Sequence, residues 1–311
     1  MVAGWASAGR PLSGPDAGLY GPDSLTWQLD REAFLLLGAG PRALLMQLAH
    51  PAIAAGVDQH SDFRTDPWRR LTGTLRSYLR LVYGTTGVAR AEIRRLNNLH
   101  RGIRGDLPGG RSYDARDPDL ALWVHATLVD STMATGSAWL EPLDHAARAR
   151  VYEESLPVGR AFGIPEGKLP ANVDAFDAYV SAMIGHGGPV VVGSLARELA
   201  DAILHPPLSP AIRTLTWPLA GTVPPSLLDA LARAGDGVPS AAIAWLFWPA
   251  IGLLPEPVRD GYGFRWGTRE RVASSWLVSA WRAWAAVLPR GFRQMPRAIA
   301  ADRRMASTIE S

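Results

Sequence analysis

A long, uninterrupted helix predicted over residues 117–139 constrains the fold more than any other feature of the sequence. Asp117 and Pro118 are typical of the N-cap and the first position of a helix, and no further proline follows before Trp139. The stretch lacks the alternation of apolar and polar residues that marks a half-buried strand. Any fold for this chain must therefore accommodate a helix of about six turns.

The rest of the chain repeats this pattern of helical segments separated by proline and glycine. Apolar residues recur at helical spacing from about residue 30 onward, and Pro41 is expected to break or restart that helix. Asp66 and Pro67 open another helix, expected over 66–82. Further helices are expected over 89–103 (ended by Gly105), 143–161, 172–184, 190–204, 208–216, 225–234, 240–254, 268–287 and 292–304.

These elements indicate an all-α protein built as one large helical domain. The one strand-like run, VVVG at 190–193, is short, and neither a repeat nor a Pro/Ser-rich linker divides the chain. Residues 1–28 are rich in Gly, Pro and Ser and are expected to form an extended or disordered arm. The helical domain then covers 29–305, and 306–311 form a tail.

No segment of the sequence predicts secretion or a membrane span. The first 18 residues contain no apolar run with a basic lead-in, so they do not resemble a secretory signal. The most apolar stretch, 241–254, has fourteen residues and contains Pro249, whereas a spanning helix needs about 20 apolar residues. We therefore expect a cytoplasmic protein without a transmembrane segment.

The C-terminal end of the chain is basic. The formal net charge of the whole chain is +3, but residues 261–311 alone carry nine arginines against three acidic residues. Such an end could contact anionic lipid or nucleic acid, although solvated helix faces are the simpler interpretation. No nucleic-acid-binding motif accompanies the charge, so we expect no nucleic-acid partner and at most weak contact with a membrane surface.

The absence of cysteine limits the chemistry of the chain. Disulfides, thiolate ligands and cysteine nucleophiles are excluded, so a metal must be held by His, Asp, Glu or a ligand from outside the chain. The sequence also lacks a GxSxG elbow, a P-loop, a dinucleotide-binding GxGxxG and an HExxH pair. Twelve tryptophans are expected mainly in the core, although an aromatic pocket would suit an apolar ligand.

His125 is the first candidate for a metal ligand. It lies within the predicted helix 117–139, and its neighbours at three- and four-residue spacing are apolar: Ala121, Leu122, Leu128 and Val129. Burial favours the neutral imidazole, which is the form that binds metal. With no second ligand on its face, His125 suits a single axial bond to a metal held in a macrocycle. From spacing alone, a buried histidine that bonds to a backbone carbonyl is the simpler interpretation.

His50 and His60 form a second candidate pair in QLAHPAIAAGVDQHSDF. Because His50 precedes Pro51, the chain is expected to turn there. The two histidines with Asp58 and Asp62 could bind non-heme iron or zinc; alternatively, 60–62 form a polar turn that caps the next helix.

Arg70 and Thr74 lie four residues apart and thus on one face of the predicted helix 66–82. A guanidinium and a hydroxyl that point together can hold a carboxylate, and a cofactor propionate would qualify. Several other arginines crowd this helix, so the pair by itself is a weak signal.

The order of the motifs is more informative than any one of them. The chain contains PRALLMQLAHPAIAAGVDQHSDFRTDPWRRLTGTL, then LHRGIRG, YDARDPDLALWVHATLVDS and LLPEPVRDGYGFRWGTRER. Over roughly residues 30–285 it resembles the oxygenase MpaB family, which shares its catalytic domain with the latex-clearing rubber oxygenases.

The resemblance implies a largely helical fold around one heme b, with dioxygen as the oxidant. It implies that His125 is the axial iron ligand and that Arg70 and Thr74 match the shared arginine and threonine. His50 and His60 match residues typical of the MpaB-like branch, and one of them is expected on the distal side. The rubber enzymes have a lysine immediately before the threonine, where this chain has Gly73. This difference argues against a lysine-capped resting state and against rubber cleavage.

Two functional hypotheses follow from the sequence. The first is a heme-dependent oxygenase or oxidase that uses dioxygen or peroxide on an apolar or aromatic small molecule, such as a natural-product intermediate. The second is a non-catalytic member of the family, either a heme-binding sensor or carrier or a metal-free helical interaction protein.

Overall fold

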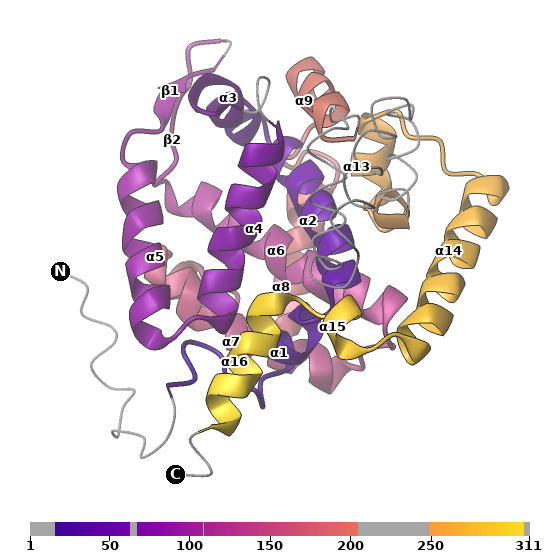
Figure 1. Cartoon of the computed structure of the whole chain (residues 1–311). Coiled ribbons are helices and arrows are strands. Elements are labelled where there is room, and N and C mark those ends of the chain that lie inside the picture. Colours follow the sequence, from indigo (N-terminus) through magenta and orange to yellow (C-terminus); the bar gives the residue numbers. More distant parts are fainter. Residues whose placement is uncertain (1–15, 63–66, 108, 205–248, 308–311) are drawn as a thin grey trace.

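The computed structural model describes residues 16–62, 67–107, 109–204 and 249–307 of the chain. In this part the elements are almost entirely helical, which confirms the all-α fold (Figure 1). The helices of the first half are α1 (Leu25–Asp30), α2 (Ala33–Leu48), α3 (Pro51–His60), α4 (Pro67–Tyr83), α5 (Thr86–His100) and α6 (Pro118–Trp139). They are followed by α7 (His145–Ala161), the 3-10 turn η2 (Glu166–Lys168), α8 (Val173–Ile184), α9 (Ser194–Leu204), α13 (Glu256–Gly261), α14 (Thr268–Val287), α15 (Arg290–Arg293) and α16 (Pro296–Ala306).

Helices α2 and α6 cross at the centre of the molecule (Figure 1). Trp123 and Trp139 of α6 are almost completely buried, and burying such a side chain contributes roughly 1.5–3 kcal/mol. The contact is close because Gly38 of α2 lies against Trp139, where a Cβ atom would lie 2.0 Å from the indole ring. Trp123 also donates from Nε1 to the carbonyl of Met46 in α2, at 3.2 Å. The long helix predicted from the sequence is therefore the core of the domain.

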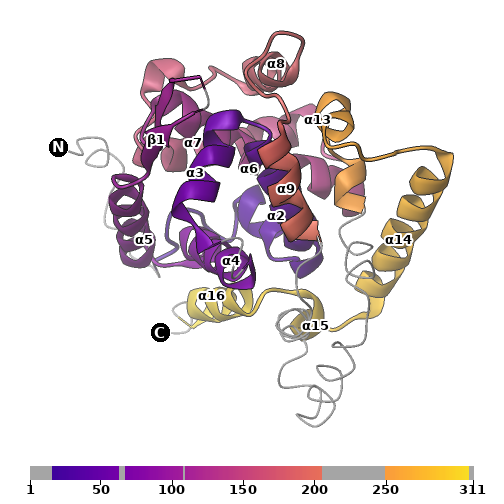
Figure 2. The same ribbon diagram turned by 90° about the horizontal axis from the view of Figure 1, so that it is seen from above.

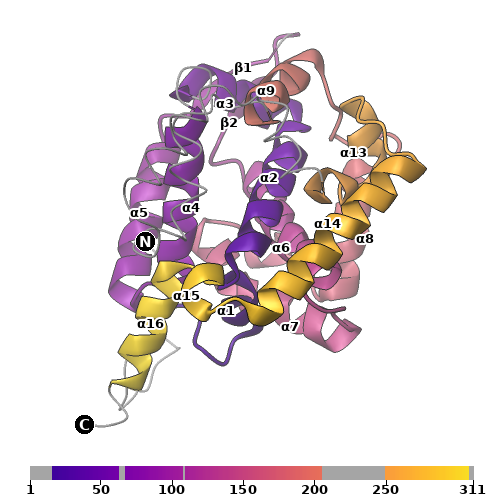
Figure 3. The ribbon, with the colours of Figure 1, turned by 45° about the vertical axis from the view of Figure 1, so that its right-hand side comes forward.

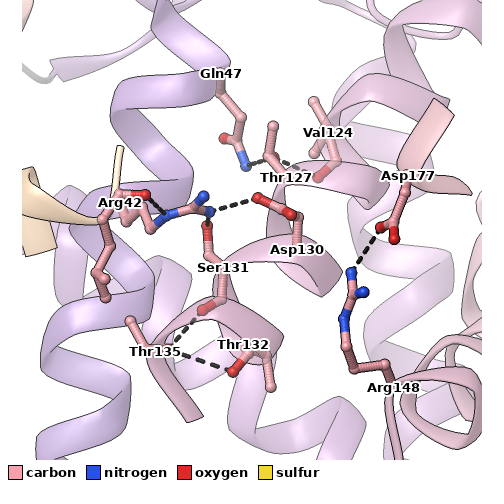
Figure 4. A network of polar contacts seen from close by, with 11 residues as sticks. Arg42, Gln47, Val124, Thr127, Asp130, Ser131, Thr132, Thr135, Arg148 and Asp177 are labelled. Atoms are coloured by element: carbon pink, nitrogen blue, oxygen red, sulfur yellow. Dashed lines mark hydrogen bonds and ion pairs between the residues drawn. The ribbon is translucent and has the colours of Figure 1, made fainter. Parts of the chain in front are cut away.

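A buried arginine links these two helices to the C-terminal part of the chain through hydrogen bonds and an ion pair (Figure 4). Arg42 of α2 is 3% exposed, and its Nη1 donates to Asp130 Oδ2 at 2.6 Å and to Ser131 Oγ at 2.8 Å. Its Nε donates to the carbonyl of Leu253 at 2.8 Å. The guanidinium thus holds three separate segments in a fixed arrangement.

The antiparallel pair α4 and α5 lies on one side of the central helices, and α14 lies on the opposite side (Figure 3). Seen from above, α3 and α9 run next to each other across α2 (Figure 2). Glu92 of α5 is buried and pairs with Arg80 and Arg95. Hydrogen bonds from Arg95, Ser77 and Arg80 outweigh its desolvation and lower the pKa of Glu92 to about 2. This pairing fixes α5 against α4.

Several boundaries agree with the sequence analysis. Asp117 caps α6 by accepting from the backbone N–H of Asp119, as the Asp-Pro pair predicts. Helices α4, α7, α8 and α14 lie within two residues of their predicted ranges. The predicted helices 208–216 and 225–234 and most of 240–254 lie outside the described residues, within which 249–252 are helical.

Four expectations about local structure were wrong. Pro41 does not break its helix, because it is buried inside a continuous α2 whose packing offsets the one missing backbone hydrogen bond. Helix α5 begins three residues before the predicted position, where Thr85 accepts from the N–H of Val88. Gly105 lies in a short hairpin, β1 (Arg104–Asp106) paired with β2 (Ser112–Asp114). Residues 190–193 are neither a strand nor the start of the helix expected over 190–204, since α9 begins at Ser194.

The N-terminal boundary of the helical domain lies before the expected residue 29. Helix α1 begins at Leu25, and Trp27 is completely buried. Its Nε1 donates to Asp302 of α16 at 3.1 Å, so α1 is tied to the C-terminal helix. Within the described ranges, no helix combines the length and apolar character needed to cross a bilayer.

Candidate active-site cavity

A cavity of about 780 Å³ lies between the pair α4–α5 and the pair α6–α7. This volume is in the range of about 300–1,000 Å³ that is typical of small-molecule sites. The wall is mainly apolar, with a smaller number of polar and charged side chains. Since side chains three and four residues apart share one helix face, α4 and α6 each present a stripe to the cavity. The stripe of α4 contains Arg70, Gly73, Thr74, Ser77, Tyr78 and Leu81, and that of α6 contains Ala121, Val124, His125, Leu128, Val129 and Thr132.

His125 lies on this wall and is 8% exposed. Burial disfavours the imidazolium and lowers the pKa of His125 to about 4, so the ring is neutral at physiological pH. Its Nε2 lies 3.2 Å from Oγ of Ser155 in α7, and that hydroxyl itself donates to the carbonyl of Tyr152 at 2.6 Å. Because the single hydroxyl proton is engaged there, Nε2 is the donor to Ser155. The sequence predicted the buried ring but not this partner.

Close packing of α7 shapes the space around the ring. Gly159 of α7 faces His125, and a Cβ atom at this position would lie 3.3 Å from Nε2. That distance is tighter than most real contacts of a Cβ atom, so a larger residue would press on the imidazole. Glycine here lets α7 pack closely against the imidazole beside Ser155.

Arg70 and Thr74 lie together at the rim of the cavity, as their spacing predicted. Nη1 of Arg70 donates to Thr74 Oγ1 at 2.9 Å, and that hydroxyl donates back to the carbonyl of Arg70 at 3.0 Å. Partial desolvation by the surrounding protein lowers the pKa of Arg70 from its usual value. No carboxylate pairs with Arg70 in the described part of the chain. A cation in this position is available to an anionic ligand.

His100, the last residue of α5, also lines this end of the cavity. Burial lowers the pKa of His100, and the positive charges of Arg70 and Arg95 lower it further. The residue lies in the LHRGIRG motif, but its position in the sequence does not indicate a role, because its proximity to Arg70 depends on the pairing of α4 with α5. Five arginines and one acidic residue are among the residues that line the whole cavity: Arg69, Arg70, Arg95, Arg101, Arg116 and Asp62.

His50 and His60 are separated by the structure. His60 is the exposed last residue of α3 and lines the cavity, with its Nε2 3.0 Å from the carbonyl of Arg104. His50 is the N-cap of α3, where its Nδ1 accepts from the N–H of Ala52 at 3.3 Å, and it is not among the residues that line the cavity. The ten-residue helix between them corresponds to about 15 Å, so the two rings cannot share one metal ion.

The described residues contain no cluster of three or more His, Asp or Glu side chains that could hold a metal ion. The non-heme iron or zinc site considered for His50, His60, Asp58 and Asp62 is therefore not formed in this part of the chain. A metal at this cavity would need most of its ligands from outside the protein, as in a macrocycle.

The inner end of the cavity lies farther along α4 and α6 than Arg70 and His125. Four hydroxyl groups line it, from Tyr20, Thr26, Tyr78 and Thr132. Sequence analysis missed them, because hydroxyl residues at helical spacing are not distinctive until α1, α4 and α6 are brought together.

Comparison with known proteins identifies related chains. The sequence model of the family described as "ER-bound oxygenase mpaB/B'/Rubber oxygenase, catalytic domain" matches residues 27–290. This range includes every residue that lines the cavity except Tyr20 and Thr26. Uncharacterized proteins of Mycobacterium bovis and Mycobacterium tuberculosis are each 26% identical over 254 residues, covering 79% of this chain and 87% of each relative. No solved structure matches the chain with significant similarity.

Proposed function

Because this chain belongs to the family of ER-bound oxygenase mpaB/B'/rubber oxygenase catalytic domains, we propose that it is a heme b-dependent oxygenase. Its substrates would be dioxygen and an apolar or aromatic small molecule. The proposal requires one heme b per chain in the cavity between α4–α5 and α6–α7.

The observation that carries the proposal is the position of His125 on the cavity wall. Its ring is buried, neutral and attached to a regular helix, and among the described residues it belongs to no group of three or more potential metal ligands. A lone neutral imidazole is poor as part of a protein-only metal cage, but it is the usual protein ligand of a heme iron. Binding through Nε2 would require the proton of the neutral ring to move to Nδ1, and the bond to iron would replace the hydrogen bond to Ser155.

The distribution of charge in the cavity also fits heme b. This cofactor is a flat apolar ring with two carboxylates on one edge, and the cavity is mainly apolar with several arginines in its lining. Arg70, free of a carboxylate partner among the described residues, and the nearby Thr74 would hold a propionate through charge-assisted hydrogen bonds. His100 would contribute a further hydrogen bond at the same end.

When bound, heme would supply the activation of dioxygen; the chain would position the reactants and exclude water. Gly73 lies on the cavity wall, and a Cβ atom there would meet no atom of the described chain within 4 Å. The α4 wall therefore has open space where the rubber enzymes have a lysine, which supports a substrate other than rubber. The mainly apolar wall favours an apolar molecule.

His60 at the cavity end of α3 would contact the substrate or dioxygen as it enters. His50 has a different place in the proposal, because its Nδ1 is engaged in capping α3. We assign it a role in positioning α3, and through α3 the ring of His60.

Reconstitution with hemin tests the proposed function. We expect the full chain to bind one equivalent of hemin with a Soret band, and the pyridine hemochrome spectrum to identify heme b. The reduced complex should then consume dioxygen in the presence of apolar substrates. A folded chain that binds no hemin would overturn the proposal, whereas a loaded chain that never reacts with dioxygen or peroxide would indicate a heme carrier.

A further inference from the structure

Asp30, the last residue of α1, is a buried acid directly behind the inner end of the cavity. Its side chain is 0% exposed, and its Oδ2 accepts a hydrogen bond from the Tyr78 hydroxyl at 2.6 Å. Its Oδ1 is inaccessible to solvent and has no hydrogen-bond partner among the described residues. A buried carboxylate with one unpartnered oxygen is unfavourable, whereas the protonated acid is tolerated.

The charges around Asp30 also favour the protonated acid. Glu154 of α7 lies nearby, where it accepts from the N–H groups of Leu25 and Thr26 at the start of α1. The adjacent Arg31 does not neutralise Asp30, because its guanidinium pairs with Asp302 at 3.0 Å. The other titratable groups that face Asp30 are the phenols of Tyr20, Tyr78 and Tyr83.

These surroundings place the titration of Asp30 near neutral pH. Burial raises the pKa of Asp30 to about 7, the negative charge of Glu154 adds to the rise, and the Tyr78 hydrogen bond opposes it. The pKa of Tyr78 is raised well above its usual value by burial and by Asp30. The pair therefore has one group that titrates and one that stays protonated.

Tyr78 connects this acid to the cavity. The side chain of Thr132 of α6 lies close enough to oppose part of the rise in the pKa of Tyr78, and both residues line the cavity. Tyr78 follows Thr74 by one turn of α4, and Thr132 follows His125 by two turns of α6, or about 10 Å along the helix. The hydroxyl of Tyr78 thus lies at the cavity end opposite to Arg70. Tyr78 shares its face of α4 with Arg70 and Thr74, and Thr132 shares its face of α6 with His125.

We propose that Asp30 and Tyr78 form a proton relay that opens on the inner end of the cavity, with Tyr78 as the group that touches the bound molecule and Asp30 as its proton reservoir. The inference deepens the proposed oxygenase function and rests on it, since dioxygen or peroxide chemistry requires protons at an oxygen atom.

The transfer is balanced in protons and moves no electrons. Tyr78 turns its O–H away from Asp30 Oδ2 and gives that proton to an oxygen atom of the bound reactant. The acid O–H of Asp30 then points to the Tyr78 oxygen, and this O–H bond breaks as its proton passes to Tyr78. Tyr78 ends as the neutral phenol and Asp30 as a carboxylate. The carboxylate regains a proton by the reverse path from water that enters once the product has left.

Infrared titration of the full chain as purified tests the reservoir without any cofactor. We expect the carbonyl band of a protonated carboxylic acid to disappear with a midpoint near the pKa of about 7 of Asp30. Asp30→Asn should lack this band, and the exposed Asp174→Asn should retain it. Tyr78→Phe should move the midpoint to higher pH, because the carboxylate loses its one donor. The relay is overturned if the wild type shows no carbonyl band that disappears in Asp30→Asn. It is also overturned if the midpoint of the titration is the same in Tyr78→Phe as in the wild type.

Reaction of the hemin-loaded chain with hydrogen peroxide tests the transfer itself. Positioned acid groups typically contribute 10²–10⁴-fold, so Tyr78→Phe and Asp30→Asn should each slow the reaction by at least about tenfold and flatten its pH profile around neutrality. Tyr83→Phe is the matched control, since Tyr83 lies on the same helix but bonds to the carbonyl of Trp27 outside the cavity lining. Equal rates in Tyr78→Phe and the wild type overturn the relay. A chain that binds no hemin contradicts the proposed function instead, and the infrared titration then decides the state of Asp30.

Discussion

Nε2 of His125 lies 3.2 Å from the hydroxyl oxygen of Ser155, so α7 supplies the hydrogen-bond partner of the imidazole that α6 presents to the cavity. The ring is neutral and its orientation is defined before any ligand binds. If iron takes the place of this hydrogen bond, the two interactions compete for one nitrogen atom.

Replacing Ser155 with alanine should separate these interactions. Losing the hydrogen bond should lower the free energy of unfolding by about 1 kcal/mol, as measured by urea denaturation. Hemin affinity should rise up to about fivefold, because the competing bond is absent from the free protein. Ser275→Ala is the control, since Ser275 makes the same bond to a carbonyl three residues earlier on exposed α14. Weaker hemin binding in Ser155→Ala would contradict the competition.

Arg70 should matter for hemin binding far more than its neighbours on α4. Arg70→Ala removes a charge-assisted hydrogen bond worth about 1.5–3 kcal/mol, so hemin affinity should fall by roughly 10–100-fold with little loss of fold. Arg76 is exposed on the same helix and is not part of the cavity lining, so Arg76→Ala should change affinity little. Soret titrations of both variants check this, and equal effects would remove the special role of Arg70.

The depressed pKa of His125 predicts a loss of stability in mild acid. The folded-state pKa is about 4 against an ordinary 6.5, so the stabilising contribution of the neutral ring is present above pH 6.5 and is lost as the pH falls toward 4. The full effect is on the order of 3 kcal/mol. The raised pKa of Asp30 makes the free energy of unfolding change with pH in the opposite direction over this range. The contribution of His125 must therefore be measured as a difference between two proteins that both contain Asp30.

Urea unfolding of the wild type and of His125→Gln between pH 4 and 7 provides that comparison. The difference in unfolding free energy between the two proteins should grow as the pH rises and level off above pH 6.5. Glu92 does not mimic this effect, because its depressed pKa acts below its ordinary value of 4.5. A difference that is independent of pH would show that the ring is not buried in its neutral form.

The buried ion pair of Arg42 with Asp130 should contribute much more than an exposed pair close by. Arg42→Met leaves Asp130 and Ser131 without their donor, so the free energy of unfolding should fall by about 3 kcal/mol. Arg148 pairs with Asp177 at 2.7 Å, with both side chains about one third exposed, and Arg148→Met should cost less than about 1 kcal/mol. Figure 4 shows both pairs. Thermal and urea denaturation of the two variants should rank them in this order.

The sequence was sufficient for the elements whose signals are local. Asp117-Pro118 gave the start of α6 correctly, and the spacing of Arg70 and Thr74 gave their contact. His50-Pro51 carries the same cap signal as Asp117-Pro118, yet the sequence analysis treated His50 as a candidate for the distal side. Pro41 was misjudged because the packing that tolerates it comes from elements distant in sequence.

The groups that sequence reasoning missed depend on contacts between distant segments. Ser155 is 30 residues from His125, and Asp30 is 48 residues from Tyr78. Neither pair has a spacing rule, because each forms only when two helices pack. The same holds for His100, whose altered pKa results from the arginines of α4 and α5.

Replacement of His125 by alanine tests the central claim most directly. The account predicts that His125→Ala loses most of its hemin and its axial-histidine spectrum, and that added imidazole partly restores the spectrum by filling the vacated position. His50→Ala and His60→Ala should retain the Soret band of the wild type. Full heme occupancy with an unchanged ferric spectrum in His125→Ala would contradict the account.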